Sequence, residues 1–223
     1  MRIGYPLTLG TGQPNSFPFN QLFSESVCVT HRNVLNREVD AIVIWGGEDI
    51  SPSIYNHRVS KFTGASDKMS DRDIVEYGLF QAAVDAGIPI IGVCRGAQLA
   101  CAASGGSLVQ HVSGHAGTPH GVTLADGRNI LVNSLHHQMM YPFETEHKLL
   151  GWSEKKLSKY YIGQDDVDID HMHDADTPEP EFVYFPETKA LAIQGHPEFM
   201  PNTTNDFVQY TLELTQKLMQ GEL

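Results

Sequence analysis

The chain alternates short apolar runs with longer amphipathic stretches. Residues 41–45 (Ala-Ile-Val-Ile-Trp), 88–91 (Ile-Pro-Ile-Ile) and 190–194 (Ala-Leu-Ala-Ile-Gln) are almost wholly apolar and show no helical period. Runs of this kind are typical of strands that are buried on both faces of a parallel sheet. Residues 3–7 predict one more strand near the start of the chain.

Three stretches predict helices. A helix is expected over residues 71–86, capped at its start by Ser70 or Asp71. Gly87 follows, a residue type that commonly ends a helix. The apolar face of this helix is expected, at helical spacing, at Val75, Leu79, Ala82, Ala83 and Ala86. Residues 97–104 are rich in small side chains and stop at a Gly-Gly pair. Within residues 205–219, one apolar face is formed by Phe207, Tyr210, Leu214 and Leu218.

The order strand, helix, strand, helix predicts an α/β fold, because parallel strands need crossover connections that cover the sheet. We expect one domain over residues 1–223, a three-layer sandwich with a central, mostly parallel sheet and helices on both faces. Residues 10–20 and 56–70 are polar or rich in Gly and Pro and predict loops, the second near the site. Residues 21–30 favour no single element.

Composition limits the binding partners and the cellular compartment that we expect for the protein. The 223 residues carry a formal net charge of −12, which argues against nucleic acid or an anionic membrane as a partner. Cys28, Cys94 and Cys101 do not form a disulfide framework, so we expect a reducing, cytoplasmic setting. The first residues lack the apolar core of a signal peptide, and no apolar stretch approaches the ~18 residues of a membrane span.

Residues 92–96 (Gly-Val-Cys-Arg-Gly) join the expected strand at 88–91 to the expected helix at 97–104. A sharp strand-turn-helix connection with small residues on both sides of its centre is typical of a nucleophile elbow. Cys94 would then lie at a helix N-terminus, where backbone N–H groups favour a thiolate, and the N–H of Arg95 would face an oxyanion. The alternative is an inert buried thiol, since free cysteine is among the most buried residue types.

Residues 195–198 (Gly-His-Pro-Glu) follow the apolar run at 190–194. Pro197 disfavours a helical conformation at His196, and in an extended segment side chains two positions apart point the same way. His196 and Glu198 are therefore expected to face one site, as a base and the carboxylate that orients it. Because the carboxyl ends of parallel strands share one edge of the sheet, we expect this pair to meet Cys94 there.

Four motifs in this order carry a family resemblance. Residues 92–96 with Gln98, and residues 195–198, resemble the class I glutamine amidotransferase superfamily. Residues 46–55 resemble the Gly-Gly-x-Asp-x-x-Pro-x-x-Tyr signature of its γ-glutamyl hydrolase branch, a peptidase C26-like group that includes γ-glutamyl-γ-aminobutyrate hydrolases. Residues 133–136 resemble the Asn-Ser-x-His motif of the same branch. The resemblance spans about residues 40–199 and implies a flavodoxin-like fold with a nucleophile elbow.

The resemblance implies the chemistry of a cysteine hydrolase. Cys94 would attack the γ-carbonyl of a glutamyl substrate, His196 would activate the thiol and protonate the leaving amine, and Glu198 would hold the imidazole. The oxyanion would be bound by the N–H groups of Arg95 and Gly47, although an ordinary strand-ending turn is the alternative for residues 46–47. The glutamyl group would be bound by Gln98, Ser134 and His136.

For Gln98, an ordinary polar position on the helix is an equal alternative. The superfamily that the chain resembles needs no cofactor and no metal. His120 stands in a context similar to the family's and is expected to line the cleft, and His137 is expected to point away from His136 in a strand. No role is expected for His111 or His115.

Two charged segments allow alternatives. Arg72 and Asp73 match a recurrent pair of the same branch, but we favour a simple charge pair at a helix N-terminus. Residues 164–181 combine His171 and His173 with several aspartates, which is one pattern of a metal site. We favour a solvated acidic loop there.

We therefore predict hydrolysis of a small γ-glutamyl-amine, with glutamate and the free amine as products. The motifs at residues 46–55 and 133–136, and the lack of a fused synthetase domain, favour this over a free-standing glutaminase subunit that supplies ammonia to a separate synthetase. A catalytically silent binding module is disfavoured by the intact set of Cys94, His196 and Glu198. The sequence leaves the amine open, and the partners to consider are a second copy in a homodimer and, for the glutaminase subunit, a synthetase.

Overall fold

The computed structural model describes residues 1–7 and 16–223. The loop expected at residues 10–20 lies partly outside the described residues, and its described end contains the 3₁₀ turn η1 (Phe19–Gln21). Residues 21–30 include the strand β2 (Glu25–Val29). None of the helices that the structure describes combines the length and the apolar character that a membrane crossing requires.

One sheet of nine strands crosses the described part of the chain. Its order is β2, β1 (Arg2–Pro6), β3 (Ala41–Ile44), β4 (Ile90–Val93), β13 (Ala190–Ile193), β12 (Pro180–Phe185), β10 (Lys148–Ser153), β7 (His120–Leu124) and β8 (Asn129–Val132). The strands from β2 to β13 are parallel, whereas those from β12 to β8 continue the sheet in antiparallel pairs. Three of the parallel strands, β3, β4 and β13, lead into the candidate residues.

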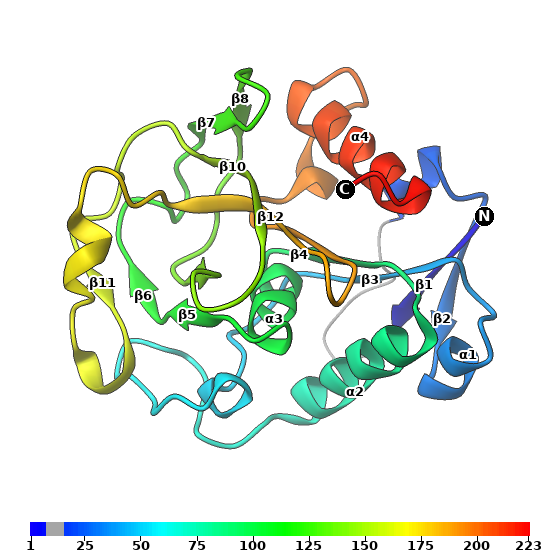
Figure 1. Cartoon of the computed structure of the whole chain (residues 1–223), viewed down its shortest axis with the longest axis horizontal. Helices are drawn as coiled ribbons and strands as arrows, with labels where there is room; N and C mark the ends of the chain where they lie inside the picture. The colour runs from blue at the N-terminus through cyan, green and yellow to red at the C-terminus, as the bar shows by residue number, and fades with distance from the viewer. Residues whose placement is uncertain (8–15) are drawn as a thin grey trace.

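Helices cover both faces of this sheet (Figure 1). On one face lies α4 (Asp206–Gln220), and on the other lie α1 (His31–Leu35), α2 (Asp71–Ala86) and α3 (Arg95–Ala103). Two small antiparallel sheets lie away from the N-terminus (Figure 1): β5 (Ser107–Val109) with β9 (Met139–Tyr141), and β6 (His111–Val112) with β11 (Tyr161–Ile162). The other short elements are η2 (Pro52–Tyr55), η3 (Gln164–Asp166), η4 (Asp170–His173) and η5 (Pro197–Phe199).

Alternation along the strands divides the core into two layers. In β3, Ile42 and Ile44 pack with α2 and α3, whereas Ala41 and Val43 pack with α4. Because successive side chains of a strand point to opposite faces and both faces are covered, all four are buried. The predicted α/β fold, with its central sheet and helices on both faces, is confirmed. The apolar runs do not indicate the antiparallel half, because β7 and β8 alternate buried with partly or fully exposed positions.

The helix α2 spans residues 71–86, as the sequence predicts. The Ser70 hydroxyl accepts a hydrogen bond from the N–H of Asp73 at 3.1 Å, and Gly87 ends the helix with a φ of 66°. One member of the expected apolar face is wrong, because Val75 is 38% exposed. The buried face instead includes Glu76, whose carboxylate contacts two buried arginines.

Gly92 and Gly96 allow the tight passage from β4 into α3. A Cβ atom added at Gly96 would overlap the carbonyl oxygen of Ile44 in β3, and one added at Gly92 would overlap the carbonyl oxygen of Gly96. These neighbours are backbone atoms in a close-packed interior, so they cannot rotate aside. The small residues expected on both sides of Cys94 therefore have a steric cause.

The same geometry predicts the cost of enlarging the elbow. Gly96→Ala should destabilise the chain by at least about 1–3 kcal/mol, because its Cβ is forced against a backbone carbonyl. Gly64→Ala is the matched control, since the nearest atom to its added Cβ is Asp49 Oδ2 at 3.5 Å, an ordinary contact. Urea unfolding of both variants measures the difference. Equal midpoints for the two variants would contradict the steric explanation.

Candidate active site

Cys94 lies where β4 passes into α3, at the N-cap position of the helix. Its backbone has a φ of 51° and a ψ of −106°, a conformation that a residue with a Cβ rarely adopts. Two hydrogen bonds hold it there: its N–H donates to the carbonyl of Ile193 at 2.8 Å, and its carbonyl accepts from the N–H of Gln98 at 3.0 Å. The side chain is thus fixed at the end of the parallel strands.

His196 and Glu198 follow β13, the strand beside β4. His196 Nδ1 lies 2.7 Å from Glu198 Oε1, so the imidazole donates its Nδ1–H to the carboxylate. The expected contact is present, and His196 lies outside the helical region as expected, with a φ of −113° and a ψ of 83°. The extended backbone expected to continue to Glu198 is wrong. Pro197 begins the 3₁₀ turn η5, and this turn brings the two side chains together.

Asn133 holds the backbone of His196 in place. Its Nδ2 donates to the carbonyl of His196 at 2.7 Å, and its Oδ1 accepts from the N–H of His196 at 2.8 Å. Asn133 is the first residue of the Asn-Ser-x-His motif, but no role for it was expected from the sequence. The motif thus connects the loop after β8 to the turn after β13.

The surroundings of His196 favour its charged form. Burial opposes the charge, but hydrogen bonding to Cys94 and Glu198 outweighs it and raises the pKa of His196 to about 10. The imidazole therefore carries a proton at neutral pH. A protonated ring can serve as the acid for a leaving group bound near Cys94.

The turn after β3 lies against this pair. A Cβ atom added at Gly46 would lie 2.7 Å from Cε1 of His196 and 3.4 Å from Cβ of Cys94. The carbonyl of Gly46 accepts from Arg72 Nη2 at 2.9 Å. Because a peptide unit is planar and trans, the N–H of Gly47 points opposite to that carbonyl, away from Arg72. Arg72 therefore sets the direction of the Gly47 N–H.

Arg72 and Asp73 belong to a buried ion cluster, so the simple charge pair at the helix N-terminus is wrong. The Arg95 guanidinium contacts Asp73 Oδ1 at 2.5 Å and also contacts Glu76. Glu76 accepts from Arg72 Nε at 2.9 Å, and all four side chains are at most 7% exposed. The cluster joins the elbow residue Arg95 to the turn at residues 46–47 through α2.

The three candidates for binding the glutamyl group meet around one loop. Gln98 Nε2 donates to the carbonyl of Gln138 at 3.2 Å, and His136 Nδ1 donates to the same carbonyl at 2.8 Å. Ser134 is 2% exposed, and its hydroxyl makes no hydrogen bond within residues 1–7 and 16–223. An unpaired buried hydroxyl is available for a polar group of a substrate.

His137 and its neighbours form a second, less buried network. His137 Nε2 lies 3.0 Å from Asp49 Oδ1, and His137 Nδ1 lies 3.2 Å from His111 Nδ1. His111 in turn stacks on the ring of Phe62. The expected strand around His136 and His137 is wrong, because residues 133–138 form a loop that turns His137 toward Asp49. The loop that carries both histidines runs from β8 to β9.

The acidic segment at 164–181 has a solvent-exposed part and a buried end. Asp165 pairs with Arg58, and His173 pairs with Asp168 at 3.0 Å, in positions that are largely open to solvent, as expected of an acidic loop. Its last two carboxylates, Glu179 and Glu181, are each 1% exposed, so the expectation of a solvated segment is wrong for them. They enter the core because β12 begins at residue 180.

Comparison with known proteins places the chain in a family. Residues 25–173, more than half of the chain, match the Peptidase C26 family, so the chain belongs to this family and to the class I glutamine amidotransferase-like superfamily. The matched stretch contains Cys94, Ser134 and His136 and ends before His196 and Glu198.

Individual relatives agree with this assignment. The glutamine amidotransferase-like protein YvdE of Lactococcus lactis is 31% identical over 180 residues, which are 72% of this chain and 66% of that protein. The carbamoyl phosphate synthase small chain of Photobacterium profundum is 30% identical over 122 residues, 55% of this chain and 27% of that one. The chain thus spans just under two thirds of the length of YvdE.

A solved structure has the same fold. A glutamine amidotransferase from Thermotoga maritima superposes with a TM-score of 0.56 at 14% identity, over 99% of this chain and 89% of that one. An identity this low supports the fold alone.

The buried ion cluster predicts a large effect of removing one carboxylate. Glu76→Ala should destabilise the chain by about 3–5 kcal/mol, because both Arg72 and Arg95 lose a buried counter-charge. The control is Glu213→Ala, which breaks solvent-exposed pairs with Arg128 and Lys217 and should cost at most about 1 kcal/mol. Urea unfolding measures the loss of unfolding free energy in each variant. Similar losses in the two variants would contradict a large contribution of the buried cluster.

The pKa of His196 predicts a pH effect of definite sign. Because it rises from 6.5 to about 10 on folding, protonation of His196 stabilises the folded chain. This stabilisation is complete below pH 6.5 and is lost as the pH rises through about 10. NMR titration of the ring should give a midpoint near 10 in the wild type and a lower one in Cys94→Ala, which lacks the sulfur partner. A wild-type midpoint near 6.5 would contradict this account.

Proposed function

We propose that the chain is a cysteine hydrolase that cleaves the γ-glutamyl amide bond of a small γ-glutamyl-amine. The observation that carries the proposal is the pairing of a strained Cys94 with a protonated His196 whose other side contacts Glu198. A cysteine at a helix N-terminus beside a charged histidine is a typical activated nucleophile. The Peptidase C26 membership supports the same chemistry.

In the first step, Cys94 attacks the γ-carbonyl carbon as a thiolate, its proton being already on His196, and a C–S bond forms. The carbonyl oxygen becomes an oxyanion, which the N–H groups of Gly47 and Arg95 stabilise. Arg72 supports this role, because its hydrogen bond to the Gly46 carbonyl turns the Gly47 N–H away from α2. The C–N bond then breaks, and the His196 imidazolium gives its proton to the departing amine.

In the second step, water attacks the γ-glutamyl thioester. His196, now neutral, takes a proton from the water as its oxygen bonds to the carbonyl carbon. The C–S bond breaks, glutamate leaves, and the sulfur and the imidazole return to their starting state. Glu198 holds Nδ1 through the 2.7 Å hydrogen bond, so that Nε2 is the atom that exchanges protons.

The loop around Ser134 is the proposed site of the glutamyl group. The free Ser134 hydroxyl fits a contact with the α-carboxylate or the α-amine, while Gln98 and His136 hold the Gln138 carbonyl of the same loop. Fixing both α-groups is what distinguishes a γ-glutamyl from an α-glutamyl substrate. We leave the amine open and propose a reducing, cytoplasmic setting, which the three free thiols fit.

The alternative is a glutaminase that passes ammonia to a synthetase. One observation favours it, namely the similarity to the small chain of carbamoyl phosphate synthase, which by its name is one chain of a larger synthase. The chemistry at Cys94 would be the same, with ammonia in place of the amine. The two functions differ in substrate choice and in dependence on a partner.

The proposed function is tested with the purified chain alone. Incubation with a panel of γ-glutamyl amides and with glutamine should release glutamate, and rapid quenching should trap a γ-glutamyl adduct on the Cys94 peptide by mass spectrometry. Cys94→Ser should abolish the adduct, and His196→Gln should lower turnover by about 10²–10⁴-fold, because proton transfer is lost.

Cys28→Ser and His31→Gln are the matched controls, because both side chains are exposed. They should keep full activity. Unchanged turnover in Cys94→Ser would overturn the mechanism. Turnover of glutamine alone, rising only when a synthetase is added, would support the glutaminase instead.

A further inference from the structure

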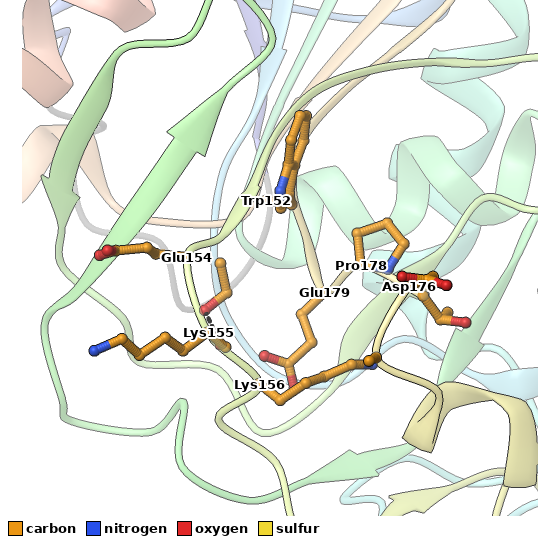
Figure 2. A pocket seen from close by; sticks show the side chains of 10 residues that line it. Trp152, Glu154, Lys155, Lys156, Asp176, Pro178 and Glu179 are labelled. Atoms are coloured by element: carbon orange, nitrogen blue, oxygen red, sulfur yellow. Dashed lines mark hydrogen bonds between the residues drawn. The ribbon is translucent and has the colours of Figure 1, made fainter.

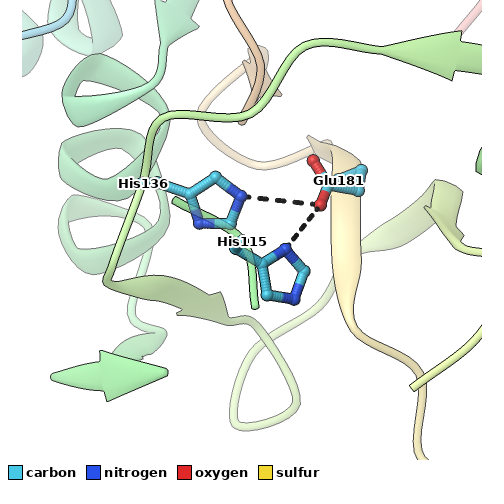
Figure 3. A group of neighbouring side chains, drawn as sticks. All are labelled: His115, His136 and Glu181. Atoms are coloured by element: carbon cyan, nitrogen blue, oxygen red, sulfur yellow. Dashed lines mark ion pairs between the residues drawn. The ribbon is translucent and has the colours of Figure 1, made fainter. Parts of the chain in front are cut away.

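Three buried side chains, one of them His136 of the proposed glutamyl-binding loop, converge on one point. His115 comes from the segment between β6 and β7, His136 from the loop after β8, and Glu181 from β12. Their exposures are 0%, 3% and 1%, and one ligand atom from each lies within 4.8 Å of the other two. Figure 3 shows both rings turning an edge toward the Glu181 carboxylate.

The hydrogen bonds of His136 leave one lone pair directed at this point. Its Nδ1 lies 2.8 Å from the Gln138 carbonyl, which can only accept, so Nδ1 carries the hydrogen. In the neutral ring Nε2 is then an acceptor. It lies 3.6 Å from Glu181 Oε1, another acceptor, and makes no hydrogen bond in the part of the chain that the structure describes.

His115 lies between two carboxylates. Its Nε2 lies 3.3 Å from Glu179 Oε2, and its Nδ1 lies 3.4 Å from Glu181 Oε1. With its hydrogen on Nε2, facing Glu179, the ring presents the Nδ1 lone pair to Glu181. Metal-binding histidines commonly donate their other N–H to a carboxylate or a backbone carbonyl. His136 Nδ1 has such a partner in the Gln138 carbonyl, and the Glu179 carboxylate is the group that faces His115 Nε2.

The distances from the carboxylate to the two rings suit a tetrahedral ion. Bonds of about 2.0–2.1 Å place two ligands of tetrahedral Zn²⁺ roughly 3.3–3.4 Å apart. The distances from Glu181 Oε1 to the two histidine nitrogens are 3.4 and 3.6 Å. Glu181 Oε1 also accepts from His120 Nε2 at 2.9 Å, a bond that would orient the carboxylate.

Charge supports the same conclusion. Glu179 and Glu181 are both 1% exposed, and a buried carboxylate needs a compensating positive charge. Glu181 makes close contacts with His115, His120 and His136. A single divalent cation would neutralise both carboxylates while the histidines stay uncharged.

We propose that His115 Nδ1, His136 Nε2 and Glu181 bind one Zn²⁺ ion. Nitrogen and oxygen ligands in this number fit zinc better than magnesium or calcium, which prefer oxygen. Glu181 Oε2 has no hydrogen bond within residues 1–7 and 16–223. The fourth tetrahedral position would be left for a water molecule. The site departs from the expectation of no metal and lies apart from the acidic stretch around His171 and His173.

The proposed ion would tie three separate segments together. One of them carries Ser134 and Asn133, and Asn133 holds the backbone of His196. The ion would thus fix the loop that is proposed to bind the glutamyl group, without touching Cys94. A pocket of about 150 Å³ lies beside the cluster, and Figure 2 shows Glu179, the partner of His115, among its lining residues together with Lys156.

Metal content and stability test the proposal without any activity assay. The full chain, stripped with a chelator and dialysed against Zn²⁺, should retain about one Zn²⁺ per chain by elemental analysis. The Tm should rise by roughly 5–10 °C when free Zn²⁺ exceeds its Kd about 100-fold. Co²⁺ in place of Zn²⁺ should give the visible absorption of a tetrahedral complex.

His115→Gln and Glu181→Gln should abolish all three effects, and His31→Gln, at an exposed position, should keep them. If the two variants do not fold, the wild type alone tests the proposal, through the change in its Tm when Zn²⁺ is removed and returned and through its Co²⁺ spectrum. A wild-type chain that retains no stoichiometric Zn²⁺ and shows no Tm shift would overturn the proposal and leave a protonated His115 between two carboxylates. Equal retention by His115→Gln would also overturn it, because surface histidines would then be the ligands.

Discussion

The buried contact of Arg95 with Glu76 and Asp73 is the interaction on which the candidate site depends. Arg95 is the first residue of α3, and the two carboxylates come from α2, which covers the same face of the sheet. Glu76 also contacts Arg72, and Arg72 holds the carbonyls of Trp45 and Gly46. One network thus fixes both backbone segments that are proposed to bind the oxyanion. Its charges are buried together, so the removal of one leaves the others uncompensated.

The strain at Cys94 is sustained by the sheet around it. A positive φ at a residue with a Cβ persists only where the surroundings enforce it. Here β13 accepts the N–H of Cys94, and the absence of side chains at Gly92 and Gly96 lets α3 approach β3. The same strand, β13, leads into His196. The neighbouring parallel strands β4 and β13 therefore carry the two groups of the proposed reaction to one edge.

The antiparallel half of the sheet contributes differently. The loop after β8 holds His196 through Asn133, and it also brings Ser134 and His136 to the site. The contact of His136 with Glu181 of β12 holds this loop, and His120 contacts the same carboxylate. The parallel half thus places the proposed nucleophile, and the antiparallel half holds the loop proposed to bind the substrate.

Local pattern by itself determined the elements whose cause is local. The apolar runs predict β3, β4 and β13, the caps at Ser70 and Gly87 predict the ends of α2, and the spacing in residues 92–96 and 195–198 predicts the elbow and the His-Glu contact. Each depends on neighbours within a few residues, through backbone sterics, capping or the strand period.

Only the tertiary structure decided which polar residues are buried. Glu76 replaces Val75 on the inner face of α2 because Arg95, 19 residues away, needs its charge. Glu179 and Glu181 leave the acidic segment for the core because His115, His120 and His136 meet them from distant segments. The contact of His196 with Glu198 was expected, but the 3₁₀ turn that forms it was not. A buried charge is stable only beside its partner, and that partner is set by the fold rather than by the neighbouring sequence.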